Sequence, residues 1–116
     1  MPTDFERPPD YDALVVALIE KTKVGKLDWQ ETASPNLFIA AVKGKQTFEV
    51  DLVSHGVPIL KVVLRVKDEE GKQIFETPPQ DFHVGGALDD LFSIARRVAM
   101  HLDERIGASI DLVQTL

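Results

Sequence analysis

The chain has 116 residues, 44% of them hydrophobic and 28% charged, which is the composition of a globular domain and not of a disordered one. It contains no cysteine, so disulfides, thiolate metal sites and cysteine nucleophiles are excluded, and a cytoplasmic setting is expected. The net charge of −6 argues against a dedicated nucleic-acid binder. No apolar run approaches the ~18 residues of a membrane span, and residues 1–10 lack the features of a signal peptide.

The first helix is expected over Tyr11–Val24, after a flexible tail of residues 1–9. Asp10 is suited to be its N-cap, and Gly25 to end it in a left-handed conformation. Its apolar residues recur at helical spacing: Leu14, Val15, Leu18 and Ile19. Residues 10–116 are expected to form one domain.

Two strands are expected next. Leu27 and Trp29 alternate with polar residues, which predicts a short strand. The segment Leu37–Val42 is continuously apolar and predicts a strand covered on both faces. Lys43-Gly44-Lys45 then turns the chain.

The following hairpin shows the clearest pattern, and the sequence favours pairing residue i with residue 112 − i. On one face of the hairpin, this register sets each apolar residue opposite another apolar residue. Its turn is centred on His55-Gly56-Val57. On the other face it sets Asp51 against Lys61 as an opposite-charge pair. The helix-covered face then comprises Phe48, Val50, Leu52, Leu60, Val62 and Leu64.

Beyond this hairpin, Asp68-Glu69-Glu70-Gly71 predicts a turn that delivers Ile74 beside Val66. Pro78 and Pro79 are expected to end the sheet. A long helix is predicted from Gly85-Gly86 to about Gly107, and the apolar residues 110–116 are expected to dock as a helical turn or a strand. The helix carries an unbroken apolar stripe: Leu88, Leu91, Phe92, Ala95, Val98, Ala99, Leu102 and Ile106.

Together these elements predict an α+β fold. It has an N-terminal helix, an antiparallel meander of four to five strands and a long C-terminal helix, with the helices packed on one face of the sheet.

No catalytic, cofactor or metal site is predicted. The three histidines, His55, His83 and His101, show none of the spacings of a metal site. The carboxylate pairs Asp89-Asp90 and Asp103-Glu104 are adjacent helical residues that point about 100° apart, so they form no ready dyad. The sequence therefore favours a protein that is not an enzyme.

The sheet face opposite the helices is the candidate interaction surface, because it mixes apolar and basic side chains. Its residues are Val53, Ile59, Lys61, Val63 and Arg65. Such a face should be covered by the C-terminal tail, by a second copy in a homodimer or by a protein partner. The leading interpretation is thus a non-enzymatic interaction or regulatory domain that self-associates.

Two other interpretations stay open. One is a small-ligand binder or an undetected enzyme with a pocket near Trp29, His83 or His101. The other is a weak nucleic-acid binder that uses Lys61, Arg65 and Lys67, although this face lacks an aromatic stacking pair.

The segment T-x-x-G-K-L-x-W, from Thr22 to Trp29, resembles one found in small uncharacterised bacterial α+β proteins. Those proteins place a helix before the segment and two or three strands after it. They close with a helix whose pattern is similar to Leu88-x-x-Leu91-Phe92-x-x-Ala95-Arg96-Arg97 here. The resemblance implies the same fold and a bacterial cytosolic setting, and it supplies no activity and no catalytic residue.

Overall fold

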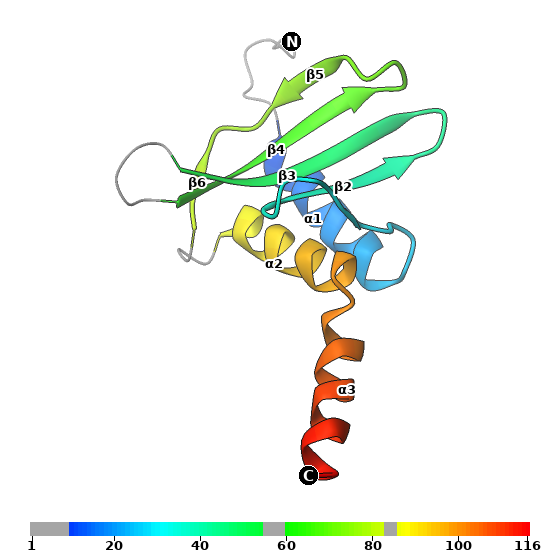
Figure 1. The fold of residues 1–116 in the computed structure, drawn as a ribbon. Helices are drawn as coiled ribbons and strands as arrows, with labels where there is room; N and C mark the ends of the chain where they lie inside the picture. Colours follow the sequence, from blue (N-terminus) through cyan, green and yellow to red (C-terminus); the bar gives the residue numbers. More distant parts are fainter. Residues whose placement is uncertain (1–9, 55–59, 83–85) are drawn as a thin grey trace, which may run out of the picture.

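The computed structural model describes residues 10–54, 60–82 and 86–116, and it shows an antiparallel sheet with two helices beneath one of its faces (Figure 1). A third helix points away from this body (Figure 1). The elements in chain order are α1 (Tyr11–Lys23), β1 (Gln30–Glu31), β2 (Leu37–Val42), β3 (Gln46–Ser54), β4 (Leu60–Asp68), β5 (Gln73–Glu76), β6 (Gln80–Asp81), α2 (Ala87–Ala99) and α3 (Leu102–Gln114). The α+β class is therefore confirmed. The expected tail, residues 1–9, lies outside the described residues.

Helix α1 begins at Tyr11 as predicted and ends at Lys23, one residue before the predicted end. The Asp10 carboxylate accepts a hydrogen bond from the backbone N–H of Ala13 at 2.9 Å, which satisfies one of the free donors of the first turn. Gly25 has a φ of +77°, the left-handed conformation that ends a helix with little strain in glycine.

The segment from Thr22 to Trp29 joins α1 to the sheet. The buried indole of Trp29 donates a hydrogen bond from Nε1 to Thr22 Oγ1 at 2.9 Å. That hydroxyl in turn donates to the carbonyl of Leu18 at 2.7 Å. The predicted strand at Leu27 and Trp29 is displaced, because both side chains anchor the loop in the core and pairing with β2 starts at Gln30.

The sheet has the order β1-β2-β3-β4-β5, and β6 pairs with β4 beyond the end of β5. Pro78 and Pro79 interrupt the pairing without ending it, so that prediction was wrong. A bulge between Val66 and Lys67 sets Phe75 opposite Val66, and Ile74, which was expected there, is 49% exposed. The described part of the sheet thus has six strands instead of four to five.

The register of the β3–β4 hairpin differs from the prediction by two residues. Val50 faces Leu64 and Glu49 faces Arg65, so partners sum to 114 and not to 112. A two-residue shift keeps every side chain on its own face, so the alternation of apolar residues cannot distinguish the two registers. The shift does change the charge pairs: Asp51 bonds to Arg65 and Lys61 to Asp81. The predicted turn at His55-Gly56-Val57 lies outside the described residues.

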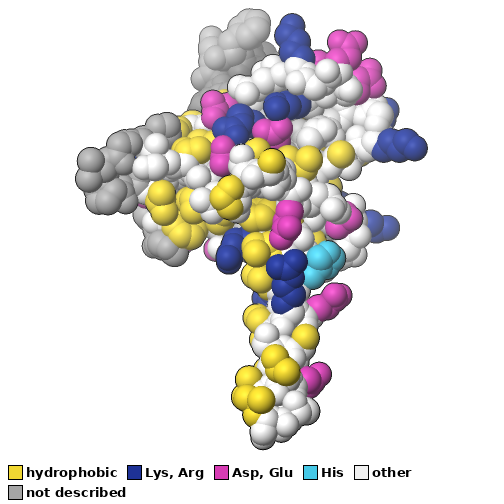
Figure 2. Space-filling model, viewed as in Figure 1, with side chains coloured by type: hydrophobic (Ala, Val, Ile, Leu, Met, Phe, Trp, Pro, Cys, Tyr) yellow, Lys and Arg dark blue, Asp and Glu magenta, His cyan; other side chains and the backbone are white. Residues whose placement is uncertain are grey.

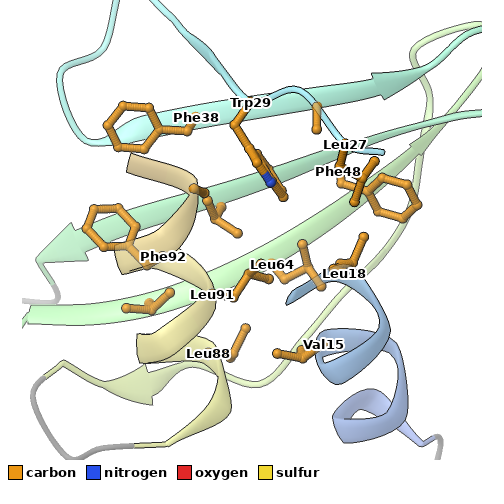
Figure 3. Close-up of a cluster of buried hydrophobic side chains, with 14 of the residues drawn as sticks. Val15, Leu18, Leu27, Trp29, Phe38, Phe48, Leu64, Leu88, Leu91 and Phe92 are labelled. Carbon is orange, nitrogen blue, oxygen red and sulfur yellow. The ribbon is translucent and has the colours of Figure 1, made fainter. Parts of the chain in front are cut away.

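The core lies between the sheet and the helices α1 and α2 (Figure 3). The predicted inward face supplies most of the sheet's share, although Leu60 at its end is 40% exposed. Only alternate residues of β2, Phe38 and Ala40, are buried, so its other face is not covered as expected. The largest fully buried side chains are Trp29, Phe38, Leu64, Leu91, Val15, Val50, Val62 and Val66.

The predicted single C-terminal helix is two helices. Met100 ends α2, and His101 has a φ of 51°, a left-handed conformation that helices of L-residues do not continue through. Helix α3 then runs through Gly107, which was expected to stop it, as far as Gln114. The expected docking of residues 110–116 is also absent, because α3 contacts α2 and no other described element.

Candidate functional site

Helix α3 is the most unusual surface of the molecule. It leaves the end of α2 and extends away from the sheet, so that the protein measures 68 Å along its longest axis against 38 and 26 Å along the others (Figure 1). None of its residues is buried. A helix normally gains most of its stability by packing an apolar face, and this 13-residue helix packs against the body only at its start.

The exposed side of α3 is apolar. Hydrophobic side chains follow the projecting helix to its end (Figure 2). The exposed residues are Ile106 (55%), Ile110 (50%), Leu112 (66%), Val113 (63%) and Leu116 (97%). Between residues 106 and 116 the sequence has one ionisable side chain, that of Asp111.

A shallow, mostly apolar groove runs along α3. Its walls are Arg105, Ile106, Ser109, Ile110, Val113 and Gln114. All of these residues belong to the same helix, so the groove has no opposing wall in this chain. Such a surface offers no chemistry beyond contact with another apolar surface.

A side-chain contact joins the start of α3 to the end of α2. Arg97, in the last turn of α2, donates a hydrogen bond from Nε to Asp103 Oδ1 at 2.8 Å, and this contact spans the left-handed residue His101. The hydrogen bond and the charge of Asp103 raise the pKa of the Arg97 guanidinium.

The predicted interaction surface occupies the sheet face that has no helix. Val63 is 2% exposed, and Val53 and Lys61 are half-buried. Ile59 lies outside the described residues. Arg65 contacts three carboxylates at once: Asp51 at 2.6 Å, Glu49 at 3.4 Å and Glu76 at 3.5 Å. This face is therefore less exposed and less apolar than α3, and α3 does not cover it.

The three cations of the nucleic-acid hypothesis are all paired. Lys61 lies 3.3 Å from Asp81, and Lys67 lies 2.7 Å from Glu49, which is itself 8% exposed. Burial lowers the pKa of the Arg65 guanidinium, but hydrogen bonds and charge from Asp51 and Glu49 outweigh burial and leave that pKa above its ordinary value. A phosphate backbone would have to displace carboxylates from each of these side chains.

The ligand hypothesis gains little from the geometry. Trp29 is 1% exposed and its indole N–H is already bonded, so the ring has no face for a ligand. His101 borders an open hollow between α1, α2 and α3, whose charged residues include the paired Arg97 and Asp103. His83 lies outside the described residues. Within residues 10–54, 60–82 and 86–116, no group of three or more histidine, aspartate or glutamate side chains could hold a metal ion.

The α3 surface was missed by sequence reasoning because residues 102 and 106 continue the stripe of α2 in phase. The useful signal was the sparse charge between residues 106 and 116. Apolar residues on several sides of a helix, with few charges, indicate a helix that must be covered.

Searches against protein-family models, curated proteins and solved structures each found no match to this chain. None of the three helices in the described ranges combines the length and apolar character needed to cross a bilayer.

Proposed function

We propose that this protein is a non-enzymatic interaction domain that self-associates through the apolar side of α3. The observation that carries the proposal is that α3 projects from a well-packed body and buries none of its own residues. The hydrophobic core takes its residues from the sheet, its loops, α1 and α2 and none from α3, so α3 is available for contact with another molecule.

The apolar side of α3 suits a small contact. Ile106, Ile110 and Val113 line the groove on one side of the helix, and each is at least half exposed. Two such faces form an interface below about 1,200 Å², the size range of weak protein–protein contacts. One ionisable group in eleven residues, Asp111, also creates little repulsion between two identical faces.

A second copy suits α3 better than a lipid surface. Helices that lie on membranes carry lysine and arginine along their polar face and are drawn to anionic lipids. Helix α3 has Arg105 alone against Asp103, Glu104 and Asp111, and the whole chain has a net charge of −6. The absence of cysteine further supports a cytosolic setting for this assembly.

Sedimentation velocity of three matched variants tests the contact surface. Ile110→Glu places a charge in the apolar face and should weaken self-association at least about tenfold, since a buried unpaired charge costs more than 1.4 kcal/mol. Ala108→Glu introduces the same residue two positions away, on the far side of the helix, and should change the dissociation constant less than about twofold.

Val53→Glu tests the sheet face in the same experiment. It should leave self-association intact, because we place the contact on α3. If Val53→Glu abolished self-association while Ile110→Glu did not, the contact would lie on the sheet face instead. Circular dichroism of each variant should show that the fold is preserved.

A further inference from the structure

We infer that two copies pair their α3 helices antiparallel, with the crossing point near Ser109, so that the two bodies lie at opposite ends of the helix pair. This inference rests on the self-association proposed above. The groove along α3 of one copy then contacts the same groove of the second copy, and a two-fold axis relates the two copies. Such an interface is isologous, with one patch serving both copies.

The spacing of the apolar residues fits an antiparallel pair. Ile106 and Val113 are seven residues apart and lie on one side of α3, because seven residues make two helical turns. Ser109 and Ile110 lie midway between them. An antiparallel pair centred there sets Ile106 of each copy against Val113 of the other. The small side chain of Ser109, which lines the groove, lets the two helices approach closely.

The shape and charge of the body also favour this orientation. Packed helices have axes about 8–10 Å apart, so a parallel pair would bring both bodies to the same end, side by side. Residues 1–101 carry 16 acids and 12 bases, a net charge of −4, so the two bodies repel each other. An antiparallel pair separates them by about the length of α3, roughly 20 Å for 13 residues.

The acidic first turn of α3 also favours the antiparallel orientation. Asp103 and Glu104 both lie in its first turn. A parallel pair would gather these four carboxylates at one end, and like charges at close range are destabilising. An antiparallel pair keeps them apart and also aligns the two helix dipoles in opposite directions.

Disulfide trapping tests the orientation, and the chain suits it because it contains no cysteine. Two full-length single variants, Ile106→Cys and Val113→Cys, are prepared with tags of different size, mixed, and oxidised gently. A disulfide requires Cα atoms within about 7 Å, so only neighbouring positions react. The mixed disulfide should form at least about fivefold more than either self-linked product.

Each outcome has one meaning. Predominant self-linkage of both variants would show a parallel pair and overturn this inference, while the proposed self-association would stand. No disulfide in a preparation that sediments as a dimer would show that positions 106 and 113 do not meet across the contact, and would also overturn the inference. A monomer by sedimentation, with no disulfide, would overturn the proposed function itself.

Discussion

Arg97 Nε donates a 2.8 Å hydrogen bond to Asp103 Oδ1, and this contact joins the last turn of α2 to the first turn of α3. Both side chains are mostly exposed, with 62% and 68% of their surface accessible, so the contact adds little to the free energy of unfolding. The contact spans a bend at His101, which lies between α2 and α3 and has a left-handed φ of 51°.

Substitution of His101 should reveal this bend. His101→Gly should raise the free energy of unfolding by about 0.5–1 kcal/mol, because glycine adopts a positive φ without steric strain. His101→Val should lower it by about 1–2 kcal/mol, because a β-branched residue is strongly disfavoured there. Urea unfolding followed by circular dichroism measures both. Equal stability of the two variants would contradict the left-handed conformation of residue 101.

Thr22→Val should cost about 1–3 kcal/mol of stability, because it leaves the buried indole N–H of Trp29 without its acceptor. Urea unfolding followed by circular dichroism measures this loss, because Trp29 is the only tryptophan and its fluorescence would be missing from a Trp29→Phe control. The control is a double-mutant cycle with Trp29→Phe, which removes the donor. The loss from Thr22→Val should be clearly smaller in the Trp29→Phe background, and an equal loss in both would rule out the bond as the cause.

Arg65→Met should cost about 2–3 kcal/mol, because it leaves the largely buried Glu49 and Asp51 with fewer cationic partners. The matched variant Lys61→Met should cost less than about 1 kcal/mol, because the pair of Lys61 with Asp81 is more exposed. Denaturant midpoints of the two variants provide the comparison. The register predicted from sequence would give Lys61 the larger effect, through Asp51, so the order of the two costs distinguishes the registers.

The sequence predicts which face of the sheet a residue lies on better than it predicts which residues pair between neighbouring strands. Alternation of apolar residues assigns Phe48, Val50, Val62 and Leu64 to the core, and all four are buried. Alternation has a period of two, so it leaves a shift of two residues undetermined. The network around Arg65 accompanies the observed register, and its carboxylates come from both β3 and β5. These carboxylates meet at Arg65 only because the tertiary structure brings β3 and β5 to either side of β4.

The candidate site was harder to predict than the core. The in-phase apolar residues of α2 and α3 indicate one continuous helix, and the break at His101 depends on a backbone conformation that histidine adopts only in some contexts. The face of α3 has the same composition as a core face. Only the path of the chain shows that it is uncovered.

The mass of the unmodified protein in solution tests the central claim most directly. Sedimentation equilibrium over a range of concentrations should show a reversible rise from the monomer mass of 12.9 kDa to twice that value. A mass that stays at 12.9 kDa up to about 100 μM, the concentration of half-association for a dimer of about 5–6 kcal/mol, would contradict self-association through α3.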